Sequence, residues 1–217
     1  MTYVRVLVSV VAALLLSPLL AAWTVGLTTD PLTDAVPWWR PRPVSARRLA
    51  TVAGVAAALA AGAAPGNPPL AWWVFAAGGA VLCVVDAEHH LLPRRIVHPL
   101  AAAVLTVLAV TAVVTGEPDR LARAVIAAAA VGAAWLAIAF LAPAAMGPGD
   151  VRVAALTAGL LGWTSWPAVL AGQLAAFGLA VVTAGILAAT HPLVTARAMQ
   201  VPMGPALIAS AALVTWL

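Results

Sequence analysis

The chain contains no lysine, only one cysteine and few charged residues of either sign. Charged residues make up 8% of its 217 residues, whereas soluble domains carry about 25%. So little polar surface excludes a soluble globular domain of this size. The single Cys83 excludes an intrachain disulfide and any zinc site that needs several cysteines.

Long apolar runs take the place of polar surface. Hydrophobic residues make up 64% of the chain, and runs approaching or exceeding the ~20 residues that cross a bilayer recur throughout it. The short alternating segments of a membrane β-barrel are absent. We therefore predict an all-α, polytopic membrane protein with six to eight transmembrane helices. The apolar runs lie at about 4–27, 49–64, 70–85, 97–115, 121–143, 153–189 and 203–217, and Trp163–Pro167 divides the sixth run into two helices.

The runs follow one another without a clear boundary, which predicts a single integral membrane domain over residues 1–217. Residues 1–48 hold a first span and an arginine- and proline-rich link, and residues 49–217 form the core. The first run resembles a signal peptide, but its length and the later spans favour a transmembrane helix. Trp38 and Trp39 in the link are typical of anchors at the membrane interface.

The distribution of arginine predicts the orientation in the membrane. With eight spans and the N-terminus outside, three arginines lie outside and eight lie in inside loops, as the positive-inside rule requires. Orientation in the lipid bilayer explains these scattered charges, and we expect no binding to nucleic acid. The inside arginines are Arg40, Arg42, Arg47, Arg48, Arg94, Arg95, Arg152 and Arg197, and the outside arginines are Arg5, Arg120 and Arg123.

Two aspartates lie where an apolar run meets a short polar loop. Acidic residues number only seven, and an ionisable group at a membrane boundary is a candidate functional residue. Asp86 and Asp150 are separated by two spans, so both lie on the same side of the membrane. By the arginine count, that side is the cytoplasm.

Two carboxylates at close range share one proton, because both cannot be ionised cheaply. The ionised member can take a proton from water while the protonated member donates to a substrate carbonyl. This is the chemistry of an aspartic peptidase, and it needs no metal or cofactor. Gly147 and Gly149 allow a sharp bend before Asp150, and Pro93, about two helical turns after Asp86, fixes a helix boundary.

Alternative roles for these residues are also open. Each aspartate could be an interfacial residue or a helix N-cap. Glu88, His89, His90 and His98 near Asp86 offer carboxylate and imidazole ligands. Because the side chains of residues 86–90 fan around a helix, we expect no metal there.

Three motifs together resemble the type IV prepilin peptidases, which are membrane aspartic proteases of the GxGD class. These motifs are Asp86 followed by Pro93, then Gly147-Pro-Gly-Asp150 two spans later, and Val201-Pro-Met-Gly-Pro-Ala206 near the end. The last is similar to the family's Pro-Phe-Gly-Pro segment. The resemblance covers roughly residues 70–217.

The resemblance implies that Asp86 and Asp150 form a catalytic dyad, without a cofactor, in a prokaryotic plasma membrane. The dyad would cleave the basic leader of prepilin or pilin-like precursors at the cytoplasmic face. Residues implied to bind substrate or shape the site are Pro93, Gly147, Gly149, Arg152, Pro202, Gly204 and Pro205.

The chain also departs from the family pattern. Long members carry a cysteine-rich segment and also methylate the new N-terminus, so this chain resembles the short, peptidase-only members. Pro148, Arg152 and Arg94 stand where other residues are more usual. Two further hypotheses remain: a small transporter that uses the acids as proton or cation sites, and a non-catalytic membrane component of a pilus or secretion machine.

Overall fold

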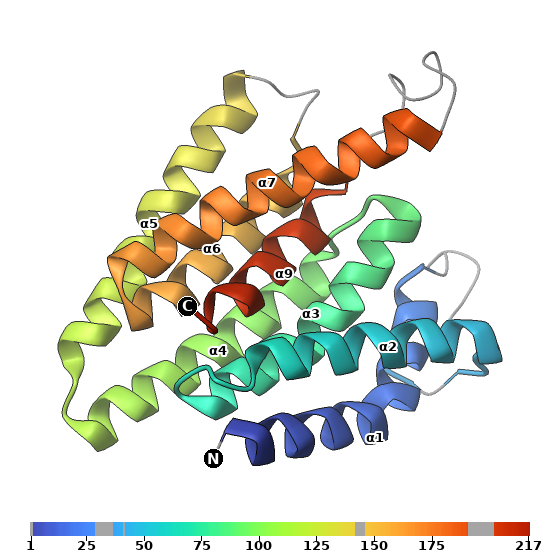
Figure 1. Cartoon of the computed structure of the whole chain (residues 1–217), viewed down its shortest axis with the longest axis horizontal. Coiled ribbons are helices and arrows are strands. Elements are labelled where there is room, and N and C mark those ends of the chain that lie inside the picture. Colours follow the sequence, from blue (N-terminus) through green and yellow to red (C-terminus); the bar gives the residue numbers. More distant parts are fainter. Residues whose placement is uncertain (1, 29–36, 41, 142–145, 191–201) are drawn as a thin grey trace.

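The computed structural model describes residues 2–28, 37–40, 42–141, 146–190 and 202–217. Within these ranges all regular secondary structure is helical (Figure 1). The described helices are α1 (Thr2–Thr28), α2 (Ala46–Ala63), α3 (Pro69–His89), α4 (Arg94–Thr115), α5 (Pro118–Leu141), α6 (Pro148–Thr164), α7 (Trp166–Thr190) and α9 (Met203–Val214).

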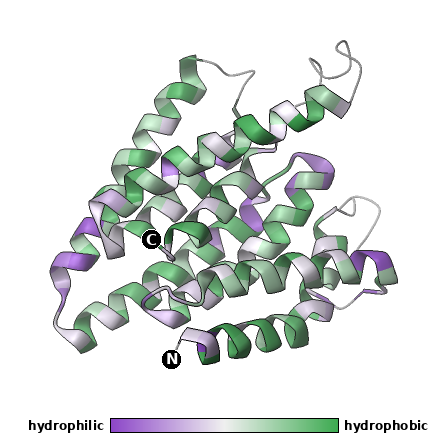
Figure 2. Cartoon of the chain, in the orientation of Figure 1, coloured by the Kyte–Doolittle hydropathy of each residue, from purple (hydrophilic) through white to green (hydrophobic). Residues whose placement is uncertain are grey.

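Six of these helices, α1 to α5 and α7, are long and apolar enough to cross a membrane. Helices α6 and α9 are shorter, with 17 and 12 residues. Hydrophobic residues extend along all of the long helices, and polar residues gather at their ends (Figure 2). The prediction of an all-α protein with six to eight membrane helices is confirmed.

Local sequence signals explain where several helices begin and end. Ser45 caps α2 by accepting a hydrogen bond from the backbone N–H of Arg48. Gly116 ends α4 with φ 69°, a left-handed conformation that glycine adopts without strain. Ser165 alone separates α6 from α7, and its Oγ accepts from the N–H of Ala168. The predicted break at 163–167 is therefore confirmed.

Successive helices run in opposite directions, so the chain alternates between two ends of the bundle (Figure 1). We call the end where α3 finishes and α6 and α9 begin the carboxylate end, because it carries Asp86 and Asp150. The arginines are distributed unequally between the two ends. Those at the carboxylate end are Arg40, Arg42, Arg47, Arg48, Arg94, Arg95 and Arg152, those at the opposite end are Arg5, Arg120 and Arg123, and Arg197 lies outside the described residues.

Helix α3 is the centre of the bundle and contacts α1, α2, α4 and α9. Its side chains Trp72, Phe75 and Leu82 are fully buried. Helix α9 in turn packs against α2, α3, α6 and α7. The helix that ends near Asp86 and the helix that begins near Gly204 are thus both held by packing on several sides.

Polar contacts fasten the outer helices to this centre. Trp73 Nε1 on α3 donates to Ser9 Oγ on α1 over 2.8 Å. Trp38, predicted as an interfacial anchor, packs edge-on against Trp23 of α1. At the end opposite the carboxylates, the Arg123 guanidinium on α5 donates to the carbonyls of residues 162, 163 and 164. These carbonyls at the C-terminus of α6 lack helical partners, so Arg123 caps that helix.

Candidate active site

Asp86 lies in the last turn of α3 and is 4% exposed. The backbone N–H of Gly204 donates to its Oδ2, with a donor–acceptor distance of 3.0 Å. Gly204 is the second residue of α9, where N–H groups have no partner within the helix and carry partial positive charge. The start of α9 therefore supplies a hydrogen bond and a favourable field to this carboxylate.

Asp150 lies in the first turn of α6, at the third helical position. Its Oδ2 accepts a hydrogen bond from the backbone N–H of Gly147 over 3.0 Å, which closes one arm of a capping box. Burial raises the pKa of the Asp150 carboxyl, and the hydrogen bonds from the N–H groups of Gly147 and of Asp150 itself oppose this shift. Burial is the larger of these opposing effects, so the net shift of the pKa is upward.

The structure brings the two aspartates together. Asp150 is near enough to Asp86 for a direct electrostatic interaction between the two carboxylates. Each carboxylate accepts from the N-terminal N–H groups of a different helix, Asp86 from α9 and Asp150 from α6. The arrangement is a carboxylate pair held by two helix N-termini at one end of the bundle.

Leu92, in the link between α3 and α4, packs between the two motif glycines. A methyl group on Gly149 would lie 2.7 Å from Leu92 Cβ, and one on Gly204 would lie 3.0 Å from Leu92 Cδ2. Both positions must therefore lack a side chain for the starts of α6 and α9 to approach this link. Sequence reasoning missed this role, since Leu92 is one apolar residue among many and no spacing marks it.

The turn that precedes Leu92 begins directly after α3. His90 has φ 52°, and its N–H donates to the carbonyl of Asp86 over 2.9 Å. A left-handed residue at this position is a common helix ending, although it is unusual for a residue other than glycine. The turn reverses the chain and places Leu92 beside the carboxylate pair.

The predicted prolines are found at the starts of the surrounding helices. Pro93 is the N-cap of α4, Pro202 is the N-cap of α9, and Pro205 lies in the first turn of α9. Pro148 is the first residue of α6, a position that favours proline because its N–H would have no partner there. The unusual residue in the Gly-x-Gly-Asp motif is thus well suited to its place.

Arg152, expected to shape the site, lines a groove between α4, α5 and α6. With 3.6 residues per turn, it points about 200° around the helix axis from Asp150. Among the described residues it has no hydrogen bond or ion pair with either aspartate. The structure therefore places this charge on the other face of α6.

Among the residues considered as metal ligands, Glu88 and His89 are neighbours, with 3.6 Å between Glu88 Oε2 and His89 Nε2. Glu88 pairs with Arg48 of α2, and His98 lines the groove beside α4. Over the described part of the chain, no group of three or more His, Cys, Asp or Glu side chains is arranged to hold a metal ion.

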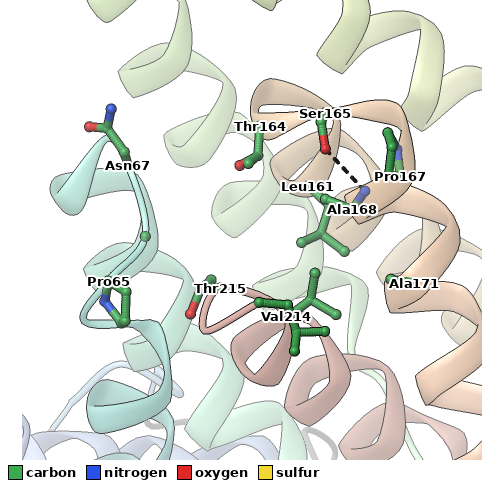
Figure 3. Close-up of a pocket in the computed structure, with 12 residues that line it drawn as sticks. Pro65, Asn67, Leu161, Thr164, Ser165, Pro167, Ala168, Ala171, Val214 and Thr215 are labelled. Carbon is green, nitrogen blue, oxygen red and sulfur yellow. Dashed lines mark hydrogen bonds between the residues drawn. The ribbon is translucent and has the colours of Figure 1, made fainter.

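A second cavity, of about 450 Å³, lies at the opposite end of the bundle (Figure 3). It is enclosed by the α2–α3 link, the junction of α6 with α7 and the end of α9, with Asn67, Thr164, Ser165 and Thr215 as polar members of its wall. No ionisable side chain lines it. Although it is larger than the groove, it offers no acid or base, and the candidate chemistry lies with the carboxylate pair.

Comparison with known protein families identifies the class to which this protein belongs. The model of the type IV leader peptidase family matches residues 73–193, which is more than half of the chain. The chain belongs to this family. The matched segment contains both aspartates and the intervening helices, and it ends before Pro202. Comparison with curated proteins gave no match, and comparison with solved structures gave none either.

Proposed function

We propose that this member of the type IV leader peptidase family is an aspartic endopeptidase that uses Asp86 and Asp150 to cleave the basic leader of prepilin or pilin-like precursors. One observation carries the proposal. The two aspartates lie at the same end of the bundle, within electrostatic range of each other, and the N-terminus of a different helix donates a backbone hydrogen bond to each.

The pair holds one proton because two adjacent carboxylates repel each other when both are ionised. The ionised carboxylate removes a proton from water, and the water oxygen adds to the carbonyl carbon of the scissile peptide bond. The protonated carboxyl donates its proton to the carbonyl oxygen. The tetrahedral intermediate then collapses: the C–N bond breaks, the leaving nitrogen takes a proton from one carboxyl, and a hydroxyl of the intermediate returns its proton to the other carboxylate, so the pair again holds one proton.

The backbone donors keep this pair in position. The N–H groups of Gly204 and Gly147 each bond the Oδ2 atom of one carboxylate, which restricts the rotation of both groups. Leu92 fills the space between the starts of α6 and α9 and so sets how closely the two carboxylates approach. The described residues thus supply the acid, the base and their support.

We further propose that the carboxylate end faces the cytoplasm of a prokaryotic cell. Seven described arginines lie at that end against three at the other, which is the asymmetry of the positive-inside rule. A basic leader is retained on the cytoplasmic side for the same reason. Enzyme and cleavage site would therefore lie on one side of the bilayer.

The experiment is cleavage of a pilin-like precursor by the protein reconstituted in liposomes. Asp86→Asn and Asp150→Asn should each reduce the rate by roughly 100- to 10,000-fold, the range attributed to a positioned acid or base. Asp119→Asn is the matched control, because Asp119 lies in the first turn of α5 as Asp150 does in α6, but at the opposite end of the bundle. Cleavage that survives either dyad substitution in a folded protein would overturn the proposal.

A further inference from the structure

Helices α4, α5 and α6 enclose an apolar groove of about 380 Å³. Small residues, Ala128 on α5 and Ala155 and Gly159 on α6, form part of its lining. Leu105 on α4 and Val125 on α5 also line it, and each is 49% exposed. Since these half-exposed apolar residues lie on membrane-spanning helices, the groove faces the lipid.

One end of the groove is cationic. Arg152 and His98 line it there, at the carboxylate end of the bundle, and no acidic residue is part of the lining. Among the described residues Arg152 has no hydrogen-bond or ion-pair partner. Arg94 lies one turn before His98 on the same face of α4. A partly buried guanidinium without a protein partner thus lies at the head of an apolar channel.

The groove is distinct from the carboxylate pair. Asp150 and Arg152 point to nearly opposite faces of α6, since two residues correspond to about 200° of helix rotation. The other α6 residues of the lining, such as Ala155 and Gly159, share the face of Arg152. The cation is therefore turned toward the lipid and away from the aspartates.

We propose that this groove binds an anionic phospholipid, with the phosphate at Arg152 and one acyl chain along α6. A guanidinium forms paired hydrogen bonds with phosphate oxygens, and basic pockets between membrane helices suit anionic headgroups. The lining of α6 from Arg152 to Leu160 spans about 12 Å of helix, enough for the upper part of an acyl chain. The charge excess at the head favours a net anionic lipid over a zwitterionic one.

The bound lipid would support the fold at a loosely packed place. Helix α4 makes far fewer contacts with α5 and α6 than α5 and α6 make with each other. An acyl chain between them would supply the missing apolar contacts. Because the ligand binds the folded protein, it should also raise the unfolding temperature.

The test is native mass spectrometry of the full-length protein in detergent, titrated with phosphatidylglycerol or phosphatidylcholine. The wild type should retain phosphatidylglycerol with at least tenfold greater affinity than phosphatidylcholine. Arg152→Gln and Val125→Trp should each weaken phosphatidylglycerol binding at least tenfold, by removing the cation and by filling the groove. Ile126→Trp and Arg47→Gln are the matched controls, since both residues are exposed and neither lines the groove.

These lipid-binding measurements test the proposed groove site independently of peptidase activity. An equal loss of phosphatidylglycerol affinity in Arg47→Gln and Arg152→Gln would show that binding depends on the general surface charge. That result would overturn the proposed site. Equal retention of the two lipids would overturn the proposed preference for a net anionic headgroup. Complete displacement of the lipid by millimolar inorganic phosphate would show an anion site without an acyl chain, and it would overturn the proposal as well. Arg152→Lys keeps the charge but not the paired hydrogen bonds, so it should bind phosphatidylglycerol more tightly than Arg152→Gln and less tightly than the wild type. This order separates the loss of charge from misfolding of the glutamine variant.

Discussion

Replacing Gly204 with alanine would place a methyl group 2.7 Å from Asp86 Oδ2 and 3.0 Å from Leu92 Cδ2. The first distance is shorter than real Cβ contacts allow, so the carboxylate or the start of α9 must shift. Such a shift disturbs the 3.0 Å hydrogen bond from the Gly204 N–H to Asp86. A hydrogen bond to a charged group contributes about 1.5–3 kcal/mol, and each 1.36 kcal/mol corresponds to a tenfold rate.

Gly204→Ala should therefore lower the rate of precursor cleavage by roughly 10- to 150-fold if the hydrogen bond is lost in the transition state. The assay is single-turnover cleavage in liposomes, with the enzyme in excess over precursor. Gly178→Ala is the control, because Gly178 also lies inside a helix, α7, and a methyl group there would meet nothing within 4 Å. In the interior of α7, Gly178→Ala gains about 1 kcal/mol of helix propensity, at least as much as Gly204→Ala gains in the first turn of α9.

A Gly204→Ala enzyme that cleaves at the wild-type rate would refute this reasoning, since the methyl group cannot be accommodated without moving Asp86 or its donor. Equal slowing by Gly178→Ala would refute it as well, because that result would assign the effect to helix propensity. Thermal unfolding of both variants separates loss of activity from loss of fold.

Three further predictions concern the support of the site and its protonation. Leu92→Ala should cost about 1–2.5 kcal/mol of stability, half of the range for a fully buried leucine, and should lower kcat for precursor cleavage more than the same change at Leu91, which is 59% exposed. Arg123→Ala should cost about 2 kcal/mol through the lost carbonyl contacts and lower Tm by roughly 4–8 °C, whereas Arg120→Ala, at an exposed ion pair, should have little effect. Because burial raises the pKa of Asp150, the wild type loses stability as pH rises through that pKa. The Tm of Asp150→Asn should therefore exceed that of wild type at pH 7–8, and the difference should shrink toward pH 4; a constant difference would contradict this.

Much of the fold could be read from the sequence, because apolar length and turn residues act locally. The break at 163–167 and the membrane helices are found where hydropathy and turn chemistry predict them. Span parity also placed Asp86 and Asp150 on one side of the membrane, and the structure has them at one end of the bundle. Parity depends only on the number of intervening spans, so small errors in helix boundaries do not affect it.

Contacts between distant segments could not be read in this way. Nothing in the sequence near Leu92 indicates that Gly149 and Gly204 pack against it, since a contact across the bundle leaves no local pattern. Arg123 was counted as a loop arginine, yet it caps α6. The family resemblance implies a role at the site for Arg152, and helix geometry turns its side chain about 200° around α6 from Asp150.

The two shortest described helices are the ones whose N-termini meet at the carboxylates. Helices α6 and α9, with 17 and 12 residues, begin at the depth of the aspartates, so their free N–H groups point at the acids instead of at lipid headgroups. These N–H groups favour an ionised carboxylate, while burial among α3, α6 and α9 favours a protonated one. In the aspartic-peptidase mechanism proposed above, this opposition would let the pair share one proton, as an acid and a base of identical chemistry require. Lengthening α9 at its start would therefore be more damaging than lengthening it at its end, where Thr215 and Trp216 donate to the Gly62 carbonyl far from the pair.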